Sequence, residues 1–330
     1  MKTRLPFTVY RLPLKFVFLV SVLWFLVSGL CGCQKGALHR DARLMMGTIV
    51  EVISPDRRAA DIAFREIKRI ENLLSYYRDN SEVSRLNKQG RLEVSPETLF
   101  VIKKAGEFWQ ATQGAFDVTV APLLELWGFS GGNYRVPDDI KIKETLELIG
   151  FDKVRISGNI IEFKTEGMKI GLGAIAKGYA VDCAARKLKL AGIKSALINA
   201  GGDIYCLGDK GGLPWRVAIN PAPSTGERRL RVRRGGIAGY LELKDKAVAT
   251  SGNYEQYFSV GDTRYCHILD PRTGRPADTD IASVTVIADD CLTADALATS
   301  IFVLGKEKGR ELAERFNVEV RIYTDVQDNK

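Results

Sequence analysis

Apolar residues recur every three or four positions in two early stretches of the chain, which predicts two amphipathic helices. The first follows Ser54-Pro55-Asp56, a typical helix start signal. The second begins at Ser95-Pro96 and ends near Gly114. The predicted buried faces are Ala63, Ile67, Ile70 and Leu74 in the first helix and Leu99, Ile102, Ala105 and Trp109 in the second. A third helix is predicted over residues 175–191.

The second half of the chain consists mainly of short apolar runs that are typical of strands. A hairpin is predicted at residues 153–163, around Ser157-Gly158-Asn159, and a strand at 195–199 leads into Gly201-Gly202. Further strands are predicted at 215–220, 240–243, 265–269, 282–288 and 318–323, with one helix at 293–304 between them. Because the strands come in blocks, we expect an α+β fold with mostly antiparallel sheets and flanking helices in a single domain.

The N-terminus is basic and then strongly apolar. Residues 16–30 carry no charge, and this run of about 15 residues is shorter than the ~20 that span a bilayer. The pattern predicts a signal peptide over residues 1–32. The sequence Leu30-Cys31-Gly32-Cys33 resembles the bacterial lipobox, so we expect cleavage before Cys33 and lipid attachment to its thiol.

This processing predicts a lipidated tether over residues 33–45, which includes His39, and a globular domain over 46–330. The expected location is the periplasmic side of a bacterial membrane, reached through the lipid anchor. The residue after the cysteine is Gln34, which leaves open whether the inner or the outer membrane holds the protein.

Composition and charge exclude several classes of protein. The 330 residues are 45% apolar and 27% charged, which is ordinary for a globular chain and excludes a disordered protein or a disulfide scaffold. Lys and Arg number 48 against 40 acids, and removal of the leader leaves 44 against 40, too small an excess for a nucleic-acid-binding protein. We expect the four remaining cysteines to be small buried residues: Cys183, Cys206, Cys266 and Cys291.

Residues 171–176 (GLGAIA) fit the pattern G-x-G-x-x-A of dinucleotide-binding folds. The preceding segment is polar where a buried parallel strand should be apolar, so we do not interpret the match as a Rossmann site. Two interpretations remain open. The free N–H groups at the helix start, with Lys177, would bind phosphate, or the glycines serve tight turn packing.

Asp295 and Thr299 lie four residues apart and so share one face of a predicted helix. Their oxygens suit Mg²⁺. The alternative is that Asp295 is a first-turn acid favoured by the helix dipole and that Thr299 faces a strand.

His267 is one of two histidines and lies at a predicted strand end. It is either structural or part of an anion pocket with Arg272 and Arg275 in the following turn. Asp117 is a base, a ligand or a turn acid, and Tyr77 stacks on a ring or closes the core. Residues 126–129 (LWGF) are typical of core.

Taken together, the motifs and their order resemble the ApbE family, the FAD:protein FMN transferases. The matching stretches cover nearly the whole chain from Met46 onward. They are residues 46–48 (MGT), 75–87, 114–129 (GAFDVTVAPLLELWGF), 171–182 (GLGAIAKGYAVD), 198–205 (INAGGDIY), 250–258, 267–277 (HILDPRTGRPA) and 283–305.

The resemblance implies an enzyme that requires Mg²⁺ and cleaves FAD. It would release AMP and attach FMN through a phosphodiester bond to a Thr or Ser hydroxyl of a target flavoprotein. Typical targets in the family are flavin-carrying subunits of membrane redox pumps. The expected partners are therefore FAD, such a flavoprotein and, through the anchor, the membrane.

The resemblance also assigns residues. It implies metal ligation by Asp295, the main catalytic carboxylate, and by Ala174, Ala298 and Thr299. It implies flavin contacts by Met46, Tyr77, Ala115, Phe116, Asp117, Lys177 and Leu269. We expect His267 to aid deprotonation of the acceptor hydroxyl. Gly171 stands in the flavin site where the family pattern usually has Asp, which predicts weaker FAD binding or substitution by a nearby acid.

Three other functions remain as alternatives. A Mg²⁺-dependent FAD pyrophosphatase, which yields FMN and AMP, would use the same residues. A non-catalytic periplasmic flavin-binding lipoprotein would not need the metal ligands. A structural envelope lipoprotein would not bind FAD at all.

Overall fold

The computed structural model describes residues 37–219 and 239–324. The chain divides into two units at Ala37, and only the second unit, which begins at Leu38, is described below. The predicted signal peptide and the lipidated Cys33 therefore lie outside the described residues.

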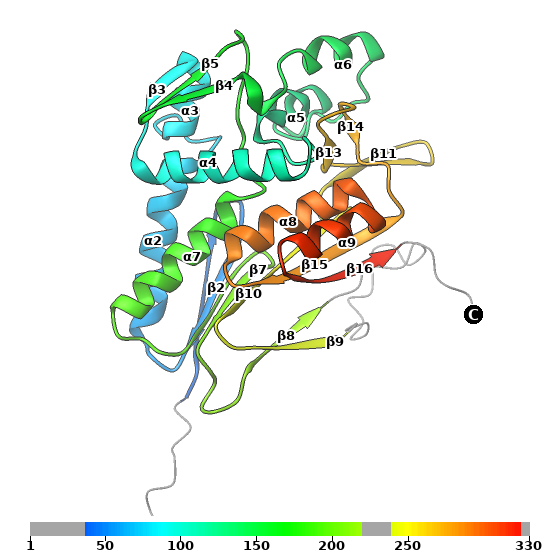
Figure 1. Cartoon of the computed structure of the whole chain (residues 1–330). Helices are drawn as coiled ribbons and strands as arrows, with labels where there is room; N and C mark the ends of the chain where they lie inside the picture. The colour runs from blue at the N-terminus through cyan, green and yellow to red at the C-terminus, as the bar shows by residue number, and fades with distance from the viewer. Residues whose placement is uncertain (1–36, 220–238, 325–330) are drawn as a thin grey trace, which may run out of the picture. The chain divides into compact units, whose positions relative to one another are not determined.

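A seven-stranded sheet forms the centre of this unit (Figure 1). Its order is β1-β2-β6-β7-β10-β15-β16, and every neighbouring pair is antiparallel. The strands are β1 His39–Met45, β2 Thr48–Ser54, β6 Ala196–Ala200, β7 Asp203–Leu207, β10 Lys246–Gly252, β15 Ile281–Ala288 and β16 Glu319–Thr324. The observed pairing confirms the predicted antiparallel α+β class.

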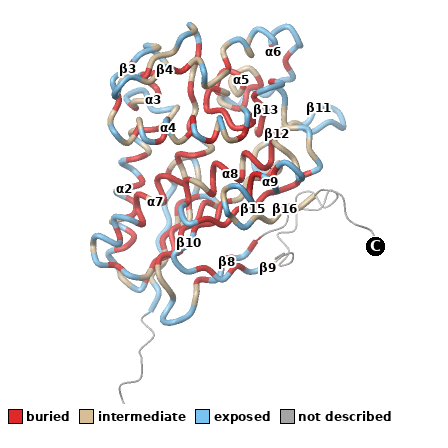
Figure 2. Tube along the Cα trace, viewed as in Figure 1, coloured by how far each residue is buried: buried red, intermediate tan, exposed pale blue. Residues whose placement is uncertain are grey.

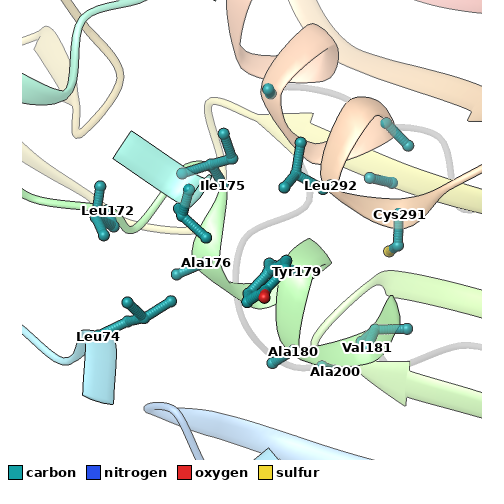
Figure 3. Packing of buried hydrophobic residues seen from close by; sticks show 14 of the residues in the cluster. Leu74, Leu172, Ile175, Ala176, Tyr179, Ala180, Val181, Ala200, Cys291 and Leu292 are labelled. Carbon is teal, nitrogen blue, oxygen red and sulfur yellow. The ribbon is translucent and has the colours of Figure 1, made fainter. Parts of the chain in front are cut away.

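Helices cover one face of this sheet. They are α2 Arg58–Leu74, α7 Ala176–Leu190, α8 Cys291–Leu304 and α9 Lys306–Arg315. Helix α8 is buried along nearly its whole length, as Figure 2 shows. Figure 3 shows how Leu172, Ile175 and Tyr179 come together with Leu74 of α2 and Leu292 of α8 in the core beneath the start of α7.

A hairpin of β8 Trp215–Ile219 and β9 Gly239–Leu243 covers the other face of the sheet. Its inward residues, Trp215, Val217 and Leu241, form a second apolar cluster with Ile204 and Val248 of the sheet. The central sheet is therefore packed on both faces, by helices on one and by this hairpin on the other.

The remaining elements lie beyond the helical layer (Figure 1). Helix α4 crosses near α8, and a three-stranded sheet lies beside it. These elements are α3 Glu82–Gln89, α4 Pro96–Ala111, α5 Ala121–Trp127, α6 Asp139–Leu146, η1 Val118–Val120, η2 Phe151–Lys153, β3 Arg91–Glu93, β4 Val154–Ser157 and β5 Ile160–Phe163. Two small hairpins complete the fold, β11 Tyr257–Val260 with β12 Thr263–Cys266, and β13 Leu269–Asp270 with β14 Arg275–Pro276.

The predicted tether is wrong in its second part. Residues 39–45 form β1, because each residue from His39 to Met45 pairs with β2 across the Met46-Gly47 turn. The predicted helix 293–304 is confirmed as α8, which Gly305 ends at φ 79°, but a second helix, α9, follows where none was predicted. The predicted strand 265–269 is interrupted at His267 and Ile268, between β12 and β13.

The cysteine prediction is confirmed, since Cys183, Cys206, Cys266 and Cys291 are free and buried. None of the helices among the described residues combines the length and the hydropathy that a bilayer-spanning helix needs.

Candidate active site

One cavity of about 300 Å³ opens beside the start of α7. Its wall comes from segments far apart in the sequence: the end of α2, the loop before η1, the glycine segment before α7, β10, the β12–β13 connection and α8. The fold therefore gathers most of the sequence motifs around a single space.

A buried charge cluster lies at this cavity. Lys177, in the first turn of α7, donates a hydrogen bond through Nζ to Asp203 Oδ2 at the start of β7. The same ammonium lies 3.7 Å from Asp295 Oδ1 on α8. The side chains of Asp203 and Asp295 are only 3% and 5% exposed, so the cation is shared by two carboxylates shielded from water.

Asp295 is not a first-turn acid. Helix α8 begins at Cys291 with Asp290 as its cap, so Asp295 is the fifth residue of the helix and gains little from the dipole. Its Oδ2 accepts a hydrogen bond from Gly178 N at 3.1 Å. Burial, with Asp203 adding to it, raises the pKa of Asp295 to about 7. A buried carboxylate that is costly to ionise next to a cavity is well suited to a cation.

Thr299 lies one turn further along α8 and lines the same cavity. Its Oγ1 is 3.2 Å from Ser251 Oγ on β10. The hydroxyl thus faces a strand, as the alternative interpretation proposed, and it also borders the cavity beside Asp295.

His267 is held in one tautomer. Its Nδ1 lies 3.1 Å from the carbonyl oxygen of Gln256, and because a carbonyl only accepts, Nδ1 carries the proton and Nε2 is left with its lone pair. Burial lowers the pKa of His267 below its ordinary value, and the charge of Lys177 adds to this. The ring of Phe129 packs edge-on against the imidazole. His267 is therefore a neutral, oriented base at the cavity wall.

The two arginines after His267 do not form an anion pocket with it. Arg272 donates two hydrogen bonds to the carboxylate of Asp270, at 2.8 and 2.7 Å, and Arg275 is paired with Asp139. Neither arginine lines the cavity. The proposed arrangement of His267 with both guanidiniums is wrong, because nearby carboxylates already satisfy them.

The model of the ApbE family matches residues 46–323, nearly the whole described unit. The chain belongs to the ApbE family. The FAD:protein FMN transferase of Vibrio cholerae serotype O1 is 36% identical over 315 residues, which cover 91% of each chain. That of Haemophilus influenzae is 33% identical over 265 residues, 77% of this chain and 75% of the relative.

Solved structures agree with this assignment. The ApbE protein of Thermotoga maritima has a TM-score of 0.77 at 36% identity, over 87% of this chain and 94% of that one. The flavin transferase ApbE from Vibrio cholerae also has a TM-score of 0.77, at 33% identity, over 88% and 96% of the two chains.

Most residues that the ApbE resemblance singled out meet in the cavity. They are Tyr77, Ala115, Phe116, Asp117, Gly171, Ala174, Lys177, His267, Leu269, Asp295 and Thr299. Met46 and Ala298 do not line it. Met46 lies in the β1–β2 turn, and its N–H donates to Glu71 Oε1, whereas Ala298 is fully buried in α8.

The geometry decides between the alternative roles left open for Tyr77 and Asp117. Tyr77 is 72% exposed at the cavity, so it does not close the core. Asp117 caps η1, and its carboxylate accepts hydrogen bonds from Thr119 N, Thr119 Oγ1 and Phe151 N. Burial raises the pKa of this carboxyl, and with three donors already bound it is a turn acid that also borders the cavity.

The glycines before α7 are not packing glycines. Neither Gly171 nor Gly173 has a positive φ, a Cβ at Gly173 would meet nothing within 4 Å, and one at Gly171 would meet Ala121 Cβ at an ordinary 3.4 Å. The tight-packing interpretation fails at both positions. The glycine that does serve packing is Gly178, where a Cβ would lie 2.3 Å from Cys291 O.

Sequence reasoning overlooked two acids at the site. The sequence patterns assign no role to Asp203, although it pairs with Lys177. Glu255 lines the cavity, and burial raises its pKa to about 7. Both lie inside motifs shared with the ApbE family, yet no spacing rule connects either of them to Lys177, because the contacts join different strands and helices.

The residues present fit a magnesium ion. Asp295 and Thr299 supply hard oxygen donors on one face of α8, both toward the cavity, and Mg²⁺ prefers oxygen ligands while keeping positions open for phosphate. Glu66, Glu97 and Cys183 also lie close enough together to hold a metal. There, however, Arg69 donates to both carboxylates and so already occupies oxygens that a metal would need.

Proposed function

We propose that this chain is a Mg²⁺-dependent FAD:protein FMN transferase, which moves FMN from FAD to a hydroxyl of a target flavoprotein. The observation that carries the proposal is the meeting of a neutral, oriented histidine with a buried Lys177–Asp295 cluster in one cavity. The names of the curated ApbE relatives, FAD:protein FMN transferases, support it.

The reaction exchanges the phosphoanhydride bond of FAD for a phosphodiester bond. The acceptor oxygen attacks the phosphorus on the FMN side of the pyrophosphate, a new P–O bond forms, and the P–O bond to AMP breaks. The proton of the acceptor hydroxyl passes to His267 Nε2, and AMP leaves with the bridging oxygen. Because the pyrophosphate supplies the energy, the transfer needs no ATP.

The chain positions the reactants and balances charge. Phosphoryl transfer depends mainly on positioning and charge neutralisation. Lys177 brings a positive charge to the phosphates, and the aromatic side chains of Tyr77 and Phe116 offer faces for the flavin ring. Asp295 and Thr299 would hold Mg²⁺, together with the backbone oxygen of Ala174 at the cavity wall. When bound, this ion neutralises charge on the pyrophosphate.

Location and partner complete the proposal. Cleavage before Cys33 and lipidation would hold the enzyme on the periplasmic side of a bacterial membrane. Flavin-carrying subunits of membrane redox pumps are the expected acceptors. An anchor in the membrane that carries such a subunit would bring enzyme and acceptor together.

The test combines the purified protein with FAD, Mg²⁺ and a candidate acceptor domain, with and without EDTA. Mass spectrometry of the acceptor should show a gain of one FMN, with an equal amount of AMP, and EDTA should abolish both. AMP without a gain on any acceptor would instead support the FAD pyrophosphatase. FAD binding without AMP would reduce the protein to a flavin carrier.

A further inference from the structure

Lys177 lies between two buried carboxylates that have different surroundings. Asp295 borders the cavity, whereas Asp203 does not and is linked to it through its hydrogen bond with Lys177. The ammonium is hydrogen-bonded to Asp203 but stands 3.7 Å from Asp295 Oδ1, beyond hydrogen-bond length. The Lys177 ammonium therefore interacts mainly with Asp203, the carboxylate that does not border the cavity.

The anchor of Lys177 is rigidly placed. Asp203 follows the turn between β6 and β7, where Gly201 and Gly202 have φ of 65° and 106°. Gly202 N donates to Asn199 Oδ1 at 2.9 Å, and Gly201 N donates to the Ile49 carbonyl. The turn is thus fixed to its own strand and to β2, so Asp203 has little freedom to move away from Lys177.

The charges around Lys177 indicate what Asp203 does. A lysine in low-dielectric surroundings needs a counter-charge, and the other carboxylates near it are Asp295 and Glu255. Without the charge of Asp203, the ammonium would turn to Asp295, the nearer of the two cavity carboxylates. A lysine hydrogen-bonded to Asp295 would then compete with a divalent cation for the same oxygens.

We propose that Asp203 is a positioning residue that holds the Lys177 ammonium off Asp295 and so keeps this carboxylate free for a divalent cation. The inference rests on the magnesium site of the proposed function. It assigns a role to a residue that does not border the substrate cavity.

The test measures cation binding rather than turnover. Free Mn²⁺ is followed by electron paramagnetic resonance while Mn²⁺ is added to the full-length protein, with FAD at a concentration that flavin fluorescence shows to be saturating for each variant. We expect Asp203→Asn to weaken Mn²⁺ binding about tenfold or more, as losses of outer-shell partners do. Adding Lys177→Met to this variant should restore most of the affinity, because the competing ammonium is gone. Lys177→Gln serves as a second version of that change.

Asp182→Asn is the matched control. Asp182 is a half-buried carboxylate of α7, but it accepts hydrogen bonds from Cys291 N and Leu292 N and is not paired with Lys177. It should leave Mn²⁺ affinity unchanged, and thermal unfolding of every variant checks that the fold is intact.

Two results would overturn the inference alone: unchanged Mn²⁺ affinity in Asp203→Asn, or a loss that neither Lys177 substitution restores. The absence of Mn²⁺ binding by the wild-type protein with FAD would reject the proposed metal site itself, and the inference with it.

Discussion

At the scale of single residues, the chemistry depends on how each group is held. Asn in place of His267 would keep similar volume but could not accept the acceptor's proton. His267→Asn should therefore lower FMN transfer by about 10²-fold or more and leave FAD affinity unchanged. Single-turnover transfer and flavin fluorescence titration measure the two quantities. Near-normal transfer with normal FAD binding would show that His267 is not the base.

Gly171 gives a second test at this scale. The family pattern usually has Asp there, and the backbone at Gly171 accepts a Cβ without strain. Gly171→Asp should therefore fold like the wild type and bind FAD more tightly, by a factor that fluorescence titration measures. If the folded variant binds FAD more weakly, FAD binding requires a residue without a side chain at position 171. Gly171→Asn, which has the same shape without the charge, is the control.

At the scale of elements, the contact between α7 and α8 sets the site. Gly178 lets α7 approach the first residues of α8, and its N–H donates to Asp295. Gly178→Ala should lower the free energy of unfolding by about 1–3 kcal/mol, because the added methyl group has no room. Urea unfolding measures this change.

Gly173→Ala is the control for that prediction, since its Cβ meets nothing within 4 Å. It should change the free energy of unfolding by no more than about 0.5 kcal/mol. If both variants lose the same free energy of unfolding, Gly178 is not needed for the close approach of α7 to α8.

Elements with strong periodicity were predictable from the sequence. The helix after Asp56 and the 153–163 hairpin occur where the pattern places them, since apolar spacing and turn residues agree there. Helix α4 was found, but its buried face was predicted only in part: Ile102 and Ala105 are buried, whereas Leu99 and Trp109 are half-buried. Helix α9 was missed because only Gly309, Leu312 and Ala313 are buried among its charged residues.

The sequence predicted only part of the candidate site. The motifs led to Asp295, Thr299 and His267, but Asp203 and Glu255 received no role. Long-range pairing brings β7 next to α7, and no local pattern contains that information. The same holds for β1, whose polar sequence suggested a tether and whose strand exists only because β2 pairs with it.

At the scale of the whole molecule, acids with raised pKa values couple stability to pH. Burial raises the pKa values of Asp182 and Asp295 to about 7 in the folded protein, from ordinary values near 4. Between these values the folded state binds more protons than the unfolded state, so stability falls as pH rises. The lowered pKa of His267 has the opposite effect, because this single group makes stability rise with pH.

Without metal, the free energy of unfolding should therefore be lower at pH 8 than at pH 5.5, by at most about 1.4 kcal/mol per pH unit and group. Urea unfolding in EDTA at the two pH values measures it, and Asp182→Asn should reduce the difference. A stability that is constant or rises over this range would contradict the prediction.

The four buried cysteines have a consequence for how the protein reaches its native state. In the folded unit their thiols are shielded from oxidants and paired with no other cysteine. If the chain is exported to an oxidising compartment, as proposed above, the same thiols would be exposed on an unfolded chain, where disulfide-forming catalysts act on any accessible thiol. The native protein then forms only if folding buries the four thiols faster than they are oxidised. The speed of folding, rather than the stability of the finished protein, would decide how much active enzyme is made.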